Sequence, residues 1–156
     1  MSDDLSTGAA LAFTPAELMA YLEEVYPVAV STGVELAELS TDRVVVQYLA
    51  HSRDLRPGDT VSGPTFMWLV DLAAYLAVLA RIGRVALAVT SSLEIHFLRK
   101  APRGQLRAEA RILKLGRRLA VTTAEVFAEH DPRPVAHATI TYAIPGTVPT
   151  SDVATQ

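Results

Sequence analysis

The stretch SGPTFMWLVDLAAYLAVLARI, residues 62–82, decides the fold. It predicts one helix from Pro64, a residue suited to the first helical turn, to Ile82, which is followed by a glycine. The helix is apolar on nearly every face, and such a helix must be surrounded by protein. Its most apolar part, residues 66–80, is short for a membrane span and contains Asp71, so the pattern favours a buried core helix.

Composition limits what the rest of the chain can be. Of its 156 residues, 50% are apolar and 20% charged, which excludes a disordered chain and predicts one domain. There is no cysteine and the four histidines lack metal-site spacing, so we expect neither disulfides nor a metal. The net charge of −3 predicts no nucleic-acid partner, but residues 79–156 carry 11 of the 14 basic side chains, where an anionic ligand would bind.

The segments on both sides of the long helix predict strands. Before it, Thr14 and Pro15 open a helix that Pro27 ends, and two strands follow over 33–50. After it, further strands are expected over 85–98, 105–115, 119–128 and 135–144. Short turns predict antiparallel pairing, and one sheet wrapped around one helix is the simplest way to bury that helix, which makes the fold class α+β. The expected boundaries are a flexible tail, a single domain and a second flexible tail: 1–12, 13–145 and 146–156.

Two features of the long helix are candidates for chemistry. Asp71 is its only acid, and since burying an unpaired carboxylate is costly, it is either a base or nucleophile or a structural group with a backbone or arginine partner. Gly63 stands at the helix start, where backbone N–H groups can polarise a carbonyl. The two are eight residues apart, about 12 Å along a helix at about 1.5 Å per residue. If both act on one carbonyl, the acid must come from a second subunit, which predicts a dimer with shared sites.

Several segments together resemble a known family. They are residues 56–64, Asp71, residues 93–98, residues 113–118 and residues 135–138. Over about residues 33–145 the chain resembles the hotdog-fold acyl-CoA thioesterases of the PaaI type. The resemblance implies a hotdog fold, in which a curved antiparallel sheet wraps around a long central helix. It also implies a homodimer joined edge to edge, with dimers often pairing into a homotetramer.

The resemblance also implies an activity and three catalytic positions. The activity is hydrolysis of acyl-CoA thioesters to free acid and coenzyme A, which is part of the substrate, so no cofactor is expected. The family's acid falls on Asp71 as general base or nucleophile, its carbonyl-polarising N–H on Gly63, and its water-placing hydroxyl on Thr90. With no cysteine and no basic leader at the start of the chain, we expect a cytoplasmic location and no membrane partner.

Substrate contacts are expected around these positions. Met67 and Tyr75 lie four residues to either side of Asp71 and share its helix face, where they could line an acyl pocket or belong to the core. Basic side chains after the 85–98 strand and in the 116–118 turn could hold the coenzyme A phosphates. The expected substrate-binding residues are Ser62, Pro64, Arg56, Met67, Tyr75, Ser91, Arg99, Lys100 and Arg117.

The chain departs from the family around the helix start. Residues 62–64 read Ser-Gly-Pro where many relatives have His-Gly-Gly, and Arg56 and Asp59 stand where many have Asn and Gly. Arg56 could instead pair with Asp54 or Asp59. Two other functions remain open: a non-catalytic acyl-CoA binding protein, and an enoyl-CoA hydratase or dehydratase on the same fold. Ser62 counts against the second, because such sites usually have a histidine there.

Overall fold

The long apolar helix is the centre of the structure. The computed structural model describes residues 10–146, and in it α3 runs over Gly63–Ile82, which confirms the expected helix. Gly83 ends it with a φ of 89°, a conformation that favours glycine. α3 is long and apolar enough to span a membrane, but 67% of its apolar window is buried inside the protein, so it is a core helix. The expected tails, 1–12 and 146–156, lie outside the described residues except at their inner ends.

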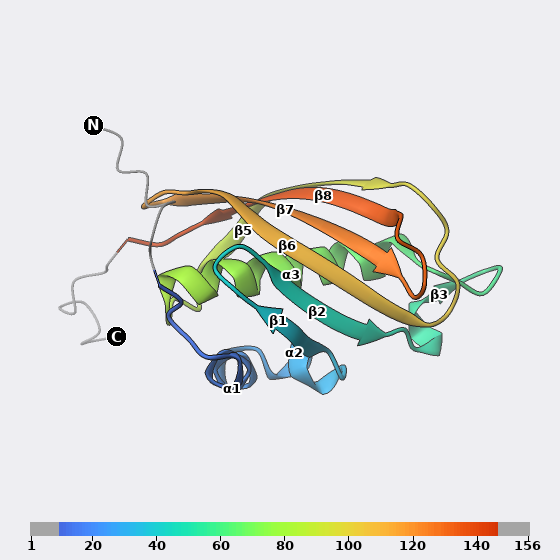
Figure 1. Cartoon of the computed structure of the whole chain (residues 1–156), viewed down its shortest axis with the longest axis horizontal. Coiled ribbons are helices and arrows are strands. Elements are labelled where there is room, and N and C mark those ends of the chain that lie inside the picture. The colour runs from blue at the N-terminus through green and yellow to red at the C-terminus, as the bar shows by residue number, and fades with distance from the viewer. Residues whose placement is uncertain (1–9, 147–156) are drawn as a thin grey trace, which may run out of the picture.

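A six-stranded antiparallel sheet curves around α3 (Figure 1). Its strands are β1 (Glu35–Leu39), β2 (Val44–Leu49), β5 (Val89–Phe97), β6 (Gln105–Leu115), β7 (Leu119–Ala128) and β8 (Pro134–Ala143). They lie in the order β1-β2-β6-β7-β8-β5, so β5, which follows α3 in the chain, is an edge strand paired only with β8. A curved antiparallel sheet around a central helix is the α+β hotdog arrangement that the sequence predicts.

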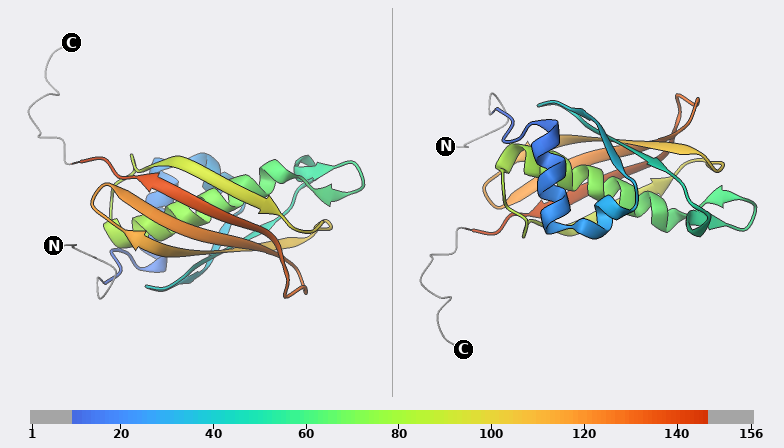
Figure 2. Two further views of the ribbon diagram at one scale, coloured as in Figure 1. Left: turned by 90° about the horizontal axis from the view of Figure 1, so that it is seen from above. Right: turned by 90° about the horizontal axis from the view of Figure 1, so that it is seen from below.

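Two N-terminal helices cover the other side of α3. α1 (Pro15–Val25) begins with the expected capping box, in which Thr14 and Glu17 each accept the backbone N–H of the other. Pro27 ends α1 as expected, but it also opens α2 (Pro27–Ser31), which the sequence did not predict. Proline suits the first turn of a helix as well as it stops the one before it. Figure 2 shows both helices on the face of α3 that the sheet leaves open.

Small side chains bring α3 and the sheet close together. Burial alternates along β6, β7 and β8, as the period of two predicts. Leu76, Leu106 and Ile140 are fully buried and fill the larger spaces of the core. Both elements carry alanines that are 5% exposed or less: Ala73, Ala74, Ala77 and Ala80 on α3, and Ala108, Ala110, Ala124 and Ala138 on the sheet.

The structure corrects two expectations about the connections. The strand expected over 85–98 begins only at Val89, because residues 85–88 form a turn in which the Ala88 N–H bonds the Val85 carbonyl at 3.0 Å. The segment 51–61, expected as a loop, contains a short 3-10 helix and a small hairpin. These elements are Ser52–Asp54, β3 (Leu55–Arg56) and β4 (Thr60–Val61).

Replacing Leu76 by alanine tests how far α3 carries the stability of the fold. Leu76 is fully buried, so Leu76→Ala should lower the free energy of unfolding by about 2–5 kcal/mol through lost burial and a cavity. The matched control is Leu113→Ala, at a side chain 60% exposed, which should change it by less than about 0.5 kcal/mol. Denaturant unfolding of both variants measures the difference, and equal values would contradict the central role of α3.

Candidate active site

Asp71 lies in the wall of a pocket of about 260 Å³ between α3, the start of β5 and the junction of α1 with α2. We call this the Asp71 pocket. Most of its lining residues are apolar or aromatic, and polar atoms contribute a comparable share of its surface, so the pocket can hold a small apolar group beside a polar one. The other lining residues are Val25, Tyr26, Trp68, Leu72, Tyr75, Ala86, Ala88, Val89, Thr90 and Tyr142.

Two hydroxyl groups hold the Asp71 carboxylate. Thr90 Oγ1 donates a hydrogen bond to Asp71 Oδ1 at 2.7 Å. The Tyr142 hydroxyl lies 2.7 Å from the same oxygen and 2.8 Å from the Asp71 carbonyl oxygen. Thr90 and Tyr142 are cross-strand partners on β5 and β8, so both hydroxyls reach α3 from one place in the sheet. Thr90, the position expected to place the attacking water, here bonds the acid itself.

Tyr75 and Tyr142 lie side by side in the lining of the Asp71 pocket. Their rings stack with centroids 6.0 Å apart, and the Tyr75 hydroxyl donates to the Ala86 carbonyl at 2.9 Å. Burial raises the pKa of both phenols above the ordinary value, and the negative charge of Asp71 raises that of Tyr142 further. Both tyrosines therefore remain protonated hydrogen-bond donors at neutral pH.

Gly63 lies in a second pocket, of about 600 Å³, at the start of α3, which we call the Gly63 pocket. Among residues 10–146 the Gly63 N–H has no hydrogen-bond acceptor, so this donor at the positive end of the helix is available to a ligand oxygen. The Phe97 ring covers the position, since a Cβ added to Gly63 would lie 3.2 Å from Phe97 Cζ. A side chain at this position would therefore crowd the ring.

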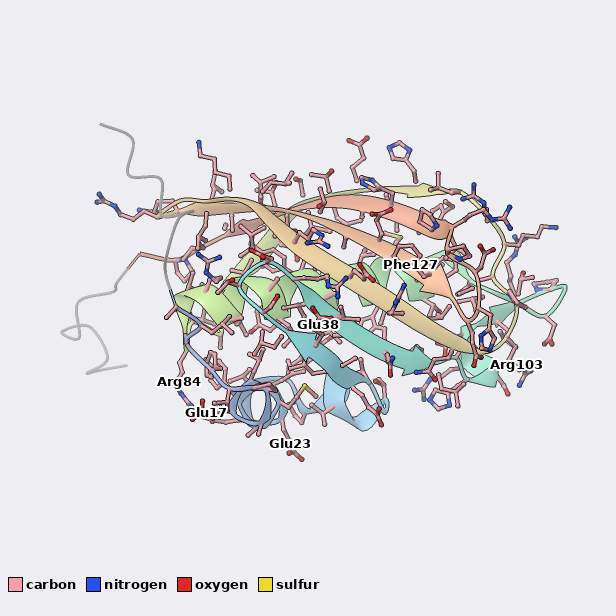
Figure 3. The ribbon with its side chains drawn as sticks, in the orientation of Figure 1. Glu17, Glu23, Glu38, Arg84, Arg103 and Phe127 are labelled. Carbon is pink, nitrogen blue, oxygen red and sulfur yellow. The ribbon has the colours of Figure 1, made fainter. Side chains whose placement is uncertain are left out.

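The Gly63 pocket is positively charged. Its charged lining residues are all basic: Arg56, Arg99 and Lys100. Arg99 donates to a backbone carbonyl at the start of β8 at 2.7 Å. Arg56 pairs with neither Asp54 nor Asp59, contrary to the alternative considered above, because Asp54 bonds other groups and Asp59 pairs with Arg103 at 3.2 Å. Arg103 lies at the same end of the molecule as β3 (Figure 3).

Asp54 anchors the segment that leads into α3. Its Oδ2 accepts hydrogen bonds from the Tyr48 hydroxyl and the His51 N–H, both at 2.7 Å, and its Oδ1 accepts one from Thr65 at 3.3 Å. Its carbonyl oxygen accepts the Ser62 N–H at 2.8 Å. Because this hydrogen bond holds Ser62, Asp54 helps to orient the N–H of Gly63, the next residue in the chain.

The expected site residues fall into two groups in one protomer. The Gly63 pocket contains Ser62, Pro64, Arg56, Arg99 and Lys100, and the Asp71 pocket contains Thr90 and Tyr75. No residue lines both pockets, so the acid and the polarising N–H face separate spaces, as their eight-residue spacing predicts.

Three expected binding residues, Met67, Ser91 and Arg117, line neither of these pockets. Met67 is 41% exposed although it lies on the helix one turn before Asp71. Ser91 is exposed, and its hydroxyl donates to a backbone carbonyl of β8 at 3.2 Å. Arg117 lies in the turn between β6 and β7, at the opposite end of the sheet from the Gly63 pocket.

Sequence reasoning missed several residues of these pockets. The sequence contained a usable signal for Tyr142. A tyrosine at an inward position of a strand needs a hydrogen-bond partner for its hydroxyl, and Asp71 was a buried acid that also needed a hydrogen-bond partner. Tyr26 lies between α1 and α2 and lines the Asp71 pocket, and the sequence pattern did not show α2. Phe97 and Asp54 left no signal, since only the folded chain brings them to the start of α3.

Fold and site together define a hotdog domain with a carboxylate in the wall of one pocket and a helix N-terminus in a second pocket. A family model described as Thioesterase superfamily matches residues 58–135, half of the chain, and the chain belongs to this superfamily. The general activity of the family is thioester hydrolysis. A comparison with curated proteins gives no match.

Solved structures agree with this assignment. A candidate thioesterase from Silicibacter sp. TM1040 is 42% identical, with a TM-score of 0.82, over 90% of this chain and 97% of that one. A variant of the phenylacetic acid degradation protein PaaI from Thermus thermophilus is 28% identical, with a TM-score of 0.67, over 76% and 99%. A candidate thioesterase related to phenylacetic acid degradation, from Ralstonia eutropha JMP134, is 25% identical, with a TM-score of 0.71, over 80% and 98%.

Asp54→Asn tests the anchor of the helix start. The amide places an N–H group against donors that now bond the carboxylate, so the free energy of unfolding should fall by about 1–3 kcal/mol. Asp59→Asn is the matched control, because its exposed ion pair contributes little and asparagine tolerates the φ of 58° at this position. Denaturant unfolding decides: an equal effect of both substitutions would show that Asp54 anchors nothing.

Proposed function

We propose that this chain hydrolyses acyl-CoA thioesters to the free acid and coenzyme A, without a separate cofactor, as a homodimer whose sites lie between subunits. Asp71 carries the proposal, because it is the only acid in α3 and it faces a pocket with apolar and aromatic side chains, in which two hydroxyls hold its carboxylate. A pocket of about 260 Å³ exceeds the roughly 150 Å³ cavity that holds benzene, so a short chain or one ring fits.

Asp71 has two routes to the thioester. As a general base it takes a proton from a water whose oxygen attacks the carbonyl carbon, and the thiolate of coenzyme A leaves. As a nucleophile it attacks that carbon itself, expels the thiolate and forms an anhydride that water then hydrolyses. In both routes negative charge develops on the carbonyl oxygen, where the Gly63 N–H would donate a hydrogen bond.

The Gly63 pocket fits the coenzyme A half of the substrate. Arg56, Arg99 and Lys100 supply positive charge there, and no acidic side chain opposes them in the lining. Arginine matches phosphate geometry through its planar donor groups. The helix N-terminus adds a further partial positive charge at the same place.

The β5 edge supports the dimer. β5 starts beside the Asp71 pocket at Val89 and ends beside the Gly63 pocket at Phe97, and these two side chains are 60% and 52% exposed. A strand of nine residues that keeps one unpaired edge is suited to pairing with another strand (Figure 2). Two-fold antiparallel pairing of β5 with its copy would bring the Asp71 pocket of one subunit beside the Gly63 pocket of the other. The tetramer and the cytoplasmic location remain further parts of this proposal.

Release of coenzyme A thiol from short aliphatic and aromatic acyl-CoA substrates tests the activity. Asp71→Asn removes the base or nucleophile and should lower kcat at least about 10²-fold on the best substrate. Asp42→Asn, in the exposed turn between β1 and β2, is the control and should keep the wild-type rate. Tight binding without release of thiol would favour the acyl-CoA binding protein, and an enoyl product without thiol would favour the hydratase.

Mixing two inactive variants tests the shared site. Gly63→Pro removes the polarising N–H, and the extended Ser62 (ψ 153°) tolerates a following proline; Gly63→Ala adds only the Cβ and controls for crowding by Phe97. Subunits of Gly63→Pro and Asp71→Asn, exchanged in denaturant and refolded, should regain about one quarter of wild-type activity, since half of the dimers are mixed and each has one intact site. No recovery would place both groups in one subunit.

A further inference from the structure

Tyr142 is a buried polar side chain that bonds Asp71 but takes no part in the reaction steps proposed above. We propose that Tyr142 is a positioning residue that, together with Thr90, fixes the Asp71 carboxylate by Oδ1 and leaves Oδ2 as the oxygen that meets the reacting water or carbonyl. This inference rests on the proposed function, because it concerns how that site is oriented.

The hydrogen bonds distinguish the two carboxylate oxygens. Thr90 and Tyr142 both bond Asp71 Oδ1 at 2.7 Å. Among residues 10–146, no group bonds Oδ2. Since a carboxylate has about four lone-pair sites, Oδ2 keeps its full capacity to accept a proton or to attack. The arrangement therefore assigns one oxygen to anchoring and the other to chemistry.

The Tyr142 hydroxyl also ties the side chain of Asp71 to its own backbone. It lies 2.7 Å from Oδ1 and 2.8 Å from the carbonyl oxygen of the same residue, so its one proton is shared between the two acceptors. A bridge between side chain and main chain restricts the rotamer of the aspartate. An orienting effect of this kind matters for catalysis, because displacement of a reacting group by about 1 Å can cost about 10²-fold in rate.

Tyr142 is rigid enough to orient another residue. Its side chain is 2% exposed, and its strand is paired on both sides, with Ala120 of β7 and Thr90 of β5. Its ring stacks on Tyr75, whose hydroxyl is in turn bonded to the turn before β5. The phenol also stays protonated, because burial and the nearby carboxylate raise its pKa. The donor that Asp71 meets is thus fixed in place and in protonation state.

Tyr142→Phe tests the inference, because it removes the hydroxyl and keeps the ring stack. We expect kcat to fall about 10- to 100-fold with KM unchanged within about twofold. In a crystal structure of the variant, Asp71 should occupy more than one rotamer.

Thr122→Val is the matched control. Thr122 is fully buried on β7, and its hydroxyl donates to the Ile140 carbonyl of β8 at 2.9 Å, so this variant also loses one buried hydroxyl on the sheet without touching Asp71. It should lose stability and keep kcat and the Asp71 rotamer.

The outcomes separate this inference from the proposed function. A Tyr142→Phe enzyme with wild-type kcat, or one whose kcat changes only as much as that of Thr122→Val, would overturn the positioning role. If the wild-type protein hydrolyses no acyl-CoA, the proposed function fails, and the Asp71 rotamer in the variant crystal still decides: a single unchanged rotamer overturns the role of Tyr142, and several rotamers support it.

Discussion

The burial of α3 on nearly all sides is the constraint on which the rest of the structure depends. A helix of 20 residues that is apolar on nearly every face cannot stay in water, so the chain must supply a sheet long enough to wrap it and further helices to cover what the sheet leaves open. The alanines on α3 and on the sheet let the two approach closely. The fold is therefore a consequence of one hydrophobic segment.

The burial of α3 also determines the surroundings of Asp71, the single acid of this helix. A carboxylate inside this packing requires hydrogen-bond partners, because leaving it unpaired would cost more than a domain of this size can spare. The partners come from two neighbouring strands, Thr90 on β5 and Tyr142 on β8. Both are hydroxyls and neither is a cation, and within residues 10–146 Asp71 forms no ion pair. The packing that stabilises the helix thus also holds a reactive group at the wall of a pocket.

Sequence patterns predicted the elements better than their assembly. α3, α1 and the strands of the sheet were confirmed because period and capping are local properties of the chain. α2 was missed because one proline both ends a helix and begins another, and the start of β5 was placed too early because residues 85–88 are apolar although they form a turn. The contacts of Tyr142 and Phe97 with α3 depend on sheet register, which a single sequence does not fix.

Within one protomer, Gly63 and Asp71 line separate pockets, and this separation bears on how the subunits assemble. Gly63 and Asp71 lie on one rigid helix, so no movement of side chains within the subunit joins them. β5 runs alongside both pockets, keeps an unpaired edge and exposes apolar side chains at each end. Both edge strands contain a bulge and a charged residue, but the other edge, β1, has only five residues against the nine of β5, and a short edge strand offers less backbone for pairing. The longer unpaired edge is the one beside the two pockets.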